Sequence, residues 1–198
     1  MKTEQIINTI IFASNVFSNS EKSYECFARE FNLSKEDLIK LNKKYFIPAK
    51  KGKYNKKQLV ERLSTELKTS KRNVLRNAKE CGKLVKTNEE VMALIKELKK
   101  GYKVITVSNT NEFFASLDTE KEQYQQFDKA ILSYKTKSLR PKLKQYKEVL
   151  KNYSVKAEEC VYIDSKEKML VPAKRLGMKT ILFREFNEFK KELDKVLR

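Results

Sequence analysis

The chain contains five short apolar runs, each bordered by polar or turn-forming residues. Apolar side chains occupy successive positions in these runs, which predicts strands buried on both faces, as in a parallel sheet covered by helices. The runs are TIIF (9–12), KVITVS (103–108), KAILS (129–133), CVYID (160–164) and KTILF (179–183). We therefore expect five β-strands, four of them in the second half of the chain.

Amphipathic helical patterns separate the later runs. Residues 88–101 place apolar side chains at helical spacing and end at Gly101, a residue type that favours helix ends. Similar patterns cover 141–153 and 169–178, where Pro172 is expected in the first helical turn. This alternation predicts an α/β fold, a Rossmann-like doubly wound parallel sheet.

Residues 20–85 show a different pattern of apolar and charged residues. They contain no convincing strand and several charged amphipathic segments, such as LSKEDLIKLNKKYF and KKQLVERLSTEL. The pattern predicts an all-helical cap inserted after the first strand. The expected domains are a core formed by 1–19 and 86–198, and a cap formed by 20–85, which is compatible with the 198 residues of the chain.

The charge of the chain suggests a polyanion as one class of partner. Lys and Arg number 44 against 26 acidic residues, for a formal net charge of +18. The basic loop PAKKGKYNKK, which surrounds Tyr54, supplies the nucleic-acid candidates Lys50, Lys51, Lys53, Lys56 and Lys57. Because only 8 of the 44 are Arg, which phosphate and base recognition favour, a solvated lysine surface is the alternative explanation.

The chain has no His, and its three cysteines, Cys26, Cys81 and Cys160, are widely spaced without a CxxC motif. This argues against zinc sites, Cys/His nucleophile pairs and a disulfide scaffold. The apolar stretch 6–13 is too short to span a bilayer, and no signal peptide is evident. We expect a reduced, cytoplasmic protein that does not bind membranes.

Polar residues follow the strands at the ends where open α/β sheets bind their ligands. Ser14 and Asn15 come after the first strand, and Ser108 and Asn109 end the second. Asp164 ends the fourth strand, and Arg140 precedes a helix on the way to it. A hydroxyl, a cation and a carboxylate are therefore expected at one rim of the sheet.

These segments resemble a known family. In order, IIFASNVF, VITVSNTNEFF, YKTKSLRPKLKQY and VYIDSKEKMLVPAKRLGMKTILF resemble the four motifs of haloacid dehalogenase-like (HAD) hydrolases, and 20–85 resembles their helical cap. The resemblance implies a Rossmann-like core, a cap that closes over the substrate, and Mg²⁺-dependent phosphoryl transfer through an aspartyl-phosphate. Such chemistry uses carboxylates as nucleophile, acid/base and metal ligands, so it needs no His.

Only part of the family pattern is present. Ser108, with Asn109 beside it, stands at the phosphate-binding hydroxyl, and Arg140 replaces the family's Lys. Ala13 stands at the nucleophile position and Asn15 at the acid/base position, so neither carboxylate is present. An Ala cannot attack phosphorus, and the covalent route is lost.

The expected metal site is also incomplete. Asp164 matches the first acid of the fourth motif, while Ser165 replaces the second, for which Glu167 is a partial substitute. With carboxylates missing, Mg²⁺ loses most of its oxygen ligands, so we expect Mg²⁺ only if the protein is active and otherwise no cofactor.

The sequence therefore predicts a HAD-like pseudoenzyme with a binding or regulatory role and an unidentified ligand or protein partner. One laboratory substitution at Ala13 would not explain the departures at Asn15, Arg140 and Ser165. The alternatives are an active Mg²⁺-dependent phosphatase of a phosphorylated small molecule, and a nucleic-acid-binding protein that uses the basic cap. An enzyme with unfamiliar residues, such as Ser14 as nucleophile, has no recognisable activating base.

Overall fold

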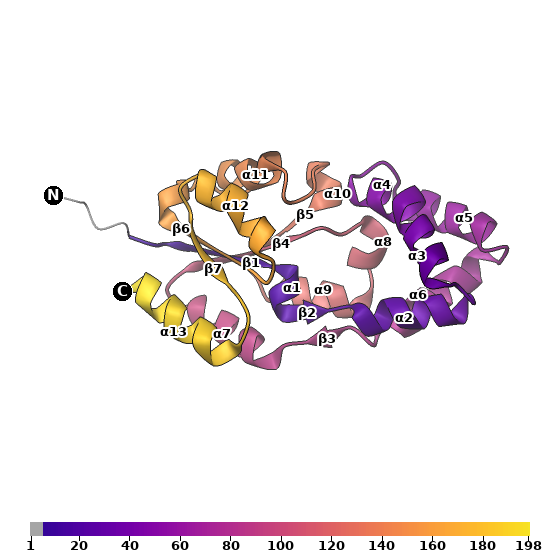
Figure 1. Cartoon of the computed structure of the whole chain (residues 1–198), viewed down its shortest axis with the longest axis horizontal. Coiled ribbons are helices and arrows are strands. Elements are labelled where there is room, and N and C mark those ends of the chain that lie inside the picture. Colours follow the sequence, from indigo (N-terminus) through magenta and orange to yellow (C-terminus); the bar gives the residue numbers. More distant parts are fainter. Residues whose placement is uncertain (1–5) are drawn as a thin grey trace.

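The structure is a computed structural model that describes residues 6–198, so the first five residues of the expected core segment 1–19 lie outside it. Figure 1 shows an elongated molecule in which a sheet with its covering helices occupies one half and a group of helices the other. No helix within residues 6–198 is long and apolar enough to cross a membrane.

The first half is built on a five-stranded parallel sheet with the strand order β5-β4-β1-β6-β7. This confirms the predicted fold class, and all five predicted strands are present. The central strand β1 is fully buried, as its mainly apolar sequence indicates. The strands are β1 (Thr9–Ala13), β4 (Lys103–Ser108), β5 (Lys129–Leu132), β6 (Cys160–Asp164) and β7 (Lys179–Leu182).

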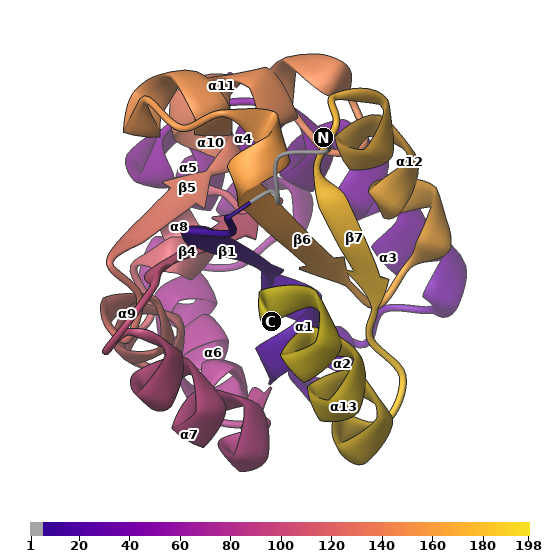
Figure 2. The ribbon, with the colours of Figure 1, turned by 90° about the vertical axis from the view of Figure 1, so that its left-hand side faces the viewer.

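Helices cover both faces of this sheet. Figures 1 and 2 show α11 (Leu143–Tyr153) and α12 (Glu167–Arg175) on one face, with α7 (Glu89–Leu98) and α13 (Phe186–Leu197) on the other. The prediction for Pro172 was wrong, because the proline lies inside α12 and not in its first turn. Its ring is buried there, which offsets part of the cost of the missing backbone donor. Short helices complete this half: α1 (Ser14–Phe17), α8 (Glu112–Ala115), α9 (Asp118–Gln125), α10 (Ser133–Thr136) and the 3-10 helix η2 (Ala157–Glu159).

The second half, called the cap below, consists of the helices between β1 and β4 that pack around their own hydrophobic core. Asn55 and Ser34 begin two of the helices as N-caps, and each forms a reciprocal capping box with the residue three positions later. The cap helices are α2 (Glu21–Glu30), α3 (Lys35–Leu41), the π-helical turn η1 (Asn42–Phe46), α4 (Ile47–Lys50), α5 (Lys56–Glu66) and α6 (Lys71–Gly82).

A disulfide joins Cys26 of α2 to Cys81 of α6 across the cap core. This contradicts the expectation of reduced cysteines. The sequence separation of 55 residues gave no sign of the pairing, because it depends on two helices lying side by side. Cys160 is the free, buried cysteine, and burial raises the pKa of its thiol to about 12, which makes it unreactive.

The cap and the sheet half are in close contact. A two-stranded antiparallel ladder of β2 (Ser18–Asn19) and β3 (Lys86–Thr87) joins the two connecting segments. Phe113 follows β4 but packs into the hydrophobic core of the cap, and the neighbouring Phe114 ring lies 5.4 Å from that of Phe46. Gly52 approaches Tyr134 so closely that a Cβ at this position would lie 2.4 Å from the Tyr134 carbonyl oxygen. The cap is therefore packed onto the edge of the sheet half where the strands end.

Candidate functional site

The parallel strands bring the predicted site residues to one edge of the sheet. Ala13 ends β1, Ser108 ends β4 and Asp164 ends β6, and all three are buried. Arg140 reaches the same place from the segment before α11 and is 7% exposed. The structure thus brings together the hydroxyl, the cation and the carboxylate expected from the sequence.

The loop that carries Arg140 is fixed to the end of β4 by Asn109. The Asn109 Oδ1 accepts from the Arg140 backbone N–H at 2.9 Å, and its Nδ2 donates to the Arg140 carbonyl at 3.0 Å. The peptide bond between Arg140 and Pro141 is cis. Because both the oxygen and the nitrogen of its side-chain amide bond to the Arg140 backbone, Asn109 orients Arg140.

Asp164 is fully buried, and its two oxygens accept four hydrogen bonds. Oδ1 accepts from the Asn15 side-chain amide at 2.9 Å and from the Lys166 backbone N–H at 3.0 Å. Oδ2 accepts from Arg140 Nη1 at 2.6 Å and from the Tyr162 hydroxyl at 3.0 Å. A carboxylate has about four lone-pair positions, so Asp164 has none left for a ligand.

Arg140 is held through its Nη1, while its Nε is buried without a hydrogen-bond partner among the described residues. Its Nη1 also donates to the Tyr162 hydroxyl at 2.8 Å. Burial works to lower the pKa of Arg140, but Tyr162 and Asp164 outweigh it and raise the pKa above the ordinary arginine value. Burial raises the pKa of Tyr162 well above that of a free tyrosine, so the hydroxyl keeps its proton. The three side chains form a buried network in which the positive charge is already neutralised.

These residues do not fit Mg²⁺. The side-chain amide of Asn15 donates to Asp164 and to Ser165 Oγ, at 2.9 and 2.6 Å, and its Oδ1, buried without a partner among the described residues, is a single neutral oxygen where a metal site needs several oxygen ligands. Glu167, the suggested second acid, is exposed at the start of α12. Within residues 6–198 no group of three or more His, Cys, Asp or Glu side chains could hold a metal ion. Asp164 is the acid left at the expected metal position, and the Arg140 guanidinium bonds to its Oδ2.

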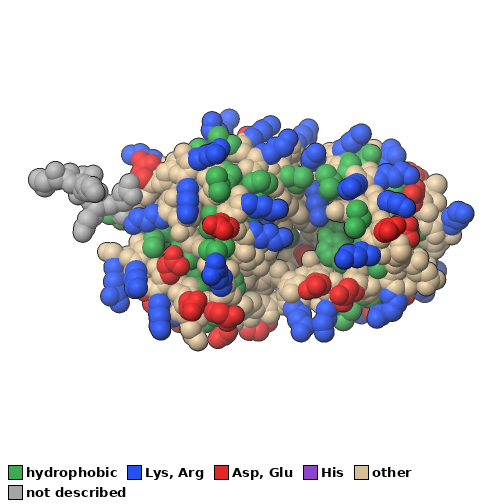
Figure 3. All heavy atoms as spheres, in the orientation of Figure 1, with side chains coloured by type: hydrophobic (Ala, Val, Ile, Leu, Met, Phe, Trp, Pro, Cys, Tyr) green, Lys and Arg blue, Asp and Glu red, His purple; other side chains and the backbone are tan. Residues whose placement is uncertain are grey.

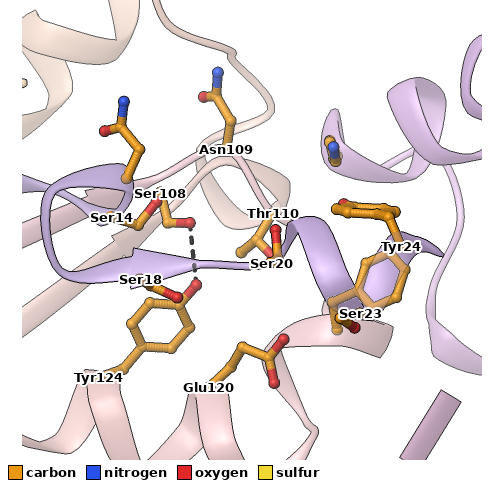
Figure 4. Close-up of a pocket in the computed structure, with 13 residues that line it drawn as sticks. Ser14, Ser18, Ser20, Ser23, Tyr24, Ser108, Asn109, Thr110, Glu120 and Tyr124 are labelled. Atoms are coloured by element: carbon orange, nitrogen blue, oxygen red, sulfur yellow. Dashed lines mark hydrogen bonds between the residues drawn. The ribbon is translucent and has the colours of Figure 1, made fainter. Parts of the chain in front are cut away.

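A cavity of about 140 Å³ lies beside this network, between the sheet half and the cap. Figure 3 shows the hollow between the two halves, and Figure 4 shows side chains from both sides directed toward the cavity. Most of the lining groups are hydroxyls and amides. The lining residues are Ser14, Asn15, Ser18, Ser20, Ser23, Tyr24, Lys50, Ser108, Asn109, Thr110, Phe114, Glu120 and Tyr124.

Glu120 and Tyr124 are among the lining residues that could not be recognised from the sequence. They lie one turn apart on α9, whose polar sequence DTEKEQYQ gives no sign of which side chains face a cavity. The Tyr124 hydroxyl donates to Ser108 Oγ at 3.0 Å, and burial raises its pKa to about 12. Ser108 is therefore already hydrogen-bonded at the position expected to hold phosphate.

Glu120 is the carboxylate of this cavity. Its Oε2 is buried and has no hydrogen-bond partner among the described residues. Burial raises the pKa of Glu120 to about 7, against the lowering effect of its own backbone amide. An acid does line this cavity, but it comes from α9 and not from the end of β1.

The basic loop of the cap does not form one site. Lys50 lines the cavity, whereas Lys51, Lys53, Lys56 and Lys57 are exposed. Figure 3 shows basic side chains spread over both halves of this face and mixed with acidic ones. The aromatic ring of the loop, Tyr54, already has the Arg62 guanidinium 4.5 Å from its centroid and Lys53 at 5.8 Å. The ring is therefore not a free platform for stacking a base.

The match to a family model decides what this chain is related to. The model described as haloacid dehalogenase-like hydrolase matches residues 2–183. The chain belongs to the haloacid dehalogenase-like hydrolase family. This confirms the resemblance found in its four sequence motifs.

Solved structures of this family share the fold. A HAD family enzyme from Bacteroides thetaiotaomicron is 20% identical, with a TM-score of 0.76 over 95% of this chain and 98% of that one. A predicted HAD-like family hydrolase from Porphyromonas gingivalis is 18% identical, with a TM-score of 0.74 over 98% of both chains. A 2-haloacid dehalogenase from Pseudomonas syringae pv. Tomato is 13% identical, with a TM-score of 0.68 over 97% of this chain and 98% of that one.

The Bacteroides enzyme has also been crystallised with magnesium and inorganic phosphate. A HAD relative with this fold thus binds magnesium. In the present HAD-like protein, the hydrogen bonds of Asn15 and Arg140 to Asp164 occupy the place where such a metal site is expected.

Proposed function

We propose that this HAD-like protein is catalytically silent and uses the cavity between core and cap to bind a small ligand. The main support for this proposal is that the lone pairs of the Asp164 carboxylate are already taken. They accept from Asn15, Arg140, Tyr162 and the Lys166 amide. Ala13, at the position of the nucleophile, supports the same conclusion, since a methyl group cannot form a phosphoryl intermediate.

The network explains why the departures from the family pattern occur together. With Ala at 13 and Asn at 15, Asp164 would be a buried acid without a metal to balance its charge. The Arg140 guanidinium supplies that balance through a 2.6 Å ion pair, and the Asn15 amide supplies a donor in place of a metal. One set of substitutions thus exchanges a metal-dependent site for a self-contained hydrogen-bond network.

Phosphate release tests the proposal. The protein is incubated with Mg²⁺ and p-nitrophenyl phosphate, and release is followed against a protein-free control. We expect no release above the control, because nucleophile and metal site are both missing. Mg²⁺-dependent release that is abolished in Ser108→Ala and Asp164→Ala variants would overturn the proposal and establish the alternative, an active phosphatase-type hydrolase.

A nucleic-acid-binding role rests on the exposed lysines of the basic loop and the net charge of +18. The occupied ring of Tyr54 and the scattered basic groups speak against a dedicated surface. Binding to single-stranded RNA or DNA is measured at low and at raised salt. If the role exists, affinity falls steeply with salt and is lost on charge reversal of Lys51, Lys53, Lys56 and Lys57 together. Absence of binding at low salt excludes it.

A further inference from the structure

The carboxylate of Glu120 is an unsatisfied acidic group at the cavity, where the neighbouring network also holds two buried atoms without a partner among the described residues, Asn15 Oδ1 and Arg140 Nε. Figure 4 shows the Glu120 side chain on the same side of the cavity as Tyr124, which follows it by four residues on α9. Its Oε2 is buried without a partner in the described part of the chain. A buried carboxylate oxygen without a donor costs free energy, and a ligand that brings a donor removes this cost.

The other charges around the cavity leave this acid uncompensated. Arg140, the cation expected to hold an anionic ligand, is neutralised by Asp164 at 2.6 Å. Lys50 lines the cavity from the cap, but it forms no ion pair with Glu120 in the described structure. A phosphate group placed beside Ser108 would therefore meet the Glu120 carboxylate and no free guanidinium, with Lys50 as the cation that lines the cavity.

The remaining lining groups recognise hydroxyls. Serine and threonine hydroxyls can each donate and accept, so they can bond ligand hydroxyls in either direction. The cavity presents such groups from both halves, Ser14 and Ser108 from the core and Ser20 and Ser23 from the cap. A volume of about 140 Å³ is well above the about 10–15 Å³ that a single water needs, so the cavity accommodates a small ligand.

We infer that the cavity binds a small, hydroxyl-bearing primary amine, whose ammonium group donates a hydrogen bond to Glu120 Oε2. The ligand hydroxyls bond to the serine hydroxyls of core and cap. This inference rests on the proposed function, because it names the ligand class of the same silent site. It also accounts for the presence of an acid in a site that no longer holds a metal.

The inference predicts how binding depends on pH. The pKa of Glu120 is raised to about 7 in the ligand-free protein, so the carboxyl is largely protonated at pH 5.5 and ionised at pH 8. The titratable groups that share the cavity are Lys50, Tyr24 and Tyr124, and the pKa of Tyr124 is raised to about 12. An ammonium ligand prefers the ionised acid, so its affinity rises by about tenfold or more from pH 5.5 to pH 8.

Three probes of similar size test the ligand class by calorimetric or NMR titration of the whole protein. They are serinol, which carries an ammonium between two hydroxymethyl groups, glycerol, in which a hydroxyl replaces that ammonium, and inorganic phosphate. We expect serinol to bind more tightly than glycerol, and phosphate not to bind. A charge-assisted hydrogen bond corresponds to a preference of about tenfold or more.

Two glutamates of the same helix provide a matched pair of variants. Glu120→Gln keeps the shape but removes the charge, whereas Glu122→Gln makes the same change at an exposed position of α9. We expect E120Q to lose about tenfold or more in serinol affinity and its pH dependence, and E122Q to bind like the unmodified protein. Thermal unfolding of each variant checks that it is folded.

The inference is overturned if serinol binds no better than glycerol or fails to bind, if E120Q and E122Q bind serinol equally, or if phosphate is the preferred probe. These results are separable from a failure of the proposed function. A Mg²⁺-dependent phosphatase activity would end the silent-site proposal, whereas loss of serinol binding alone leaves that proposal standing with a different ligand.

Discussion

Arg140 and Asp164 form an ion pair at the centre of the site, with Nη1 and Oδ2 2.6 Å apart and side chains only 5% and 0% exposed. The pair joins the loop before α11 to the end of β6. Opposite charges at this separation are stabilising only while both are present, because each alone would be a buried, uncompensated charge. The pair therefore has a structural role, and in the proposed silent site it takes the place of a metal ion.

The first prediction concerns this pair. Asp164→Asn and Arg140→Met each leave a buried charge unpaired, so each variant is expected to lower the free energy of unfolding by about 3–5 kcal/mol. The double variant is expected to lose clearly less than the sum. Urea denaturation of the unmodified protein, the two single variants and the double variant measures the coupling.

Asp194→Asn, in the exposed Lys190–Asp194 pair, is the control and should lower the free energy of unfolding by at most about 1 kcal/mol. Additive losses at the buried pair would contradict the prediction.

The second prediction is that Ala13→Asp alone restores no phosphatase activity. Ala13 is fully buried, and a carboxylate there would lie near Asp164, whose lone pairs are already occupied. We expect no Mg²⁺-dependent release of phosphate and a loss of about 1–3 kcal/mol in unfolding free energy relative to Ala13→Asn, which adds similar bulk without the charge. Turnover in this single variant would show that Asp164 can exchange its hydrogen bonds for a metal.

The sheet could be predicted because its strands are short, mostly apolar runs. Lys103–Ser108 and Cys160–Asp164 have the predicted bounds, and the other three strands agree within one residue at their ends. Burial of both faces leaves little choice of residue type, so the pattern is strong. Because parallel strands end at one edge, the convergence of Ser108, Arg140 and Asp164 also followed from the sequence.

The partners of these residues could not be predicted. That Asn15 donates to Asp164 depends on a contact across 149 positions of sequence. Glu120 lies on a helix with acidic neighbours that are exposed, and residue type alone does not separate the one that faces a cavity. The Cys26–Cys81 disulfide was missed for the same reason, since three widely spaced cysteines say nothing about which helices pack together.

The third prediction concerns this disulfide. Its loop of about 55 residues corresponds to roughly 4 kcal/mol of stabilisation in the chain-entropy model, so a reducing agent should lower the unfolding temperature. Cys81→Ser should have the lower unfolding temperature without reductant and show no further response to it. Mass spectrometry of the denatured, alkylated protein should find one labelled cysteine, Cys160, before reduction and three afterwards. Three labels before reduction would show that the bond does not form.

The fourth prediction concerns the contact of Gly52 with the sheet half. Its φ of +71° disfavours any side chain, and a Cβ there would lie 2.4 Å from the Tyr134 carbonyl oxygen, which is backbone and cannot move freely. Gly52→Ala should therefore lower the unfolding free energy by about 1–3 kcal/mol. Gly101→Ala is the control, because nothing lies within 4 Å of a Cβ at that position. Equal stability of the two variants would mean that the cap does not approach the sheet half as closely as described.

The fifth prediction is a pH dependence of stability set by Glu120. The folded protein holds the pKa of this carboxyl at about 7, above the ordinary value of 4.5, so the folded state binds the proton more tightly than the unfolded state. The stability that this provides is fully present below about pH 4.5 and is lost as the pH rises toward and past 7, by up to about 3 kcal/mol.

The measurement is urea denaturation at pH 4.5, 6 and 8. Relative to E120Q, the unmodified protein should lose stability across this range, while E122Q should follow the unmodified protein. A parallel course of E120Q and the unmodified protein would show that Glu120 is not desolvated, and would remove the burial on which its role in the cavity rests.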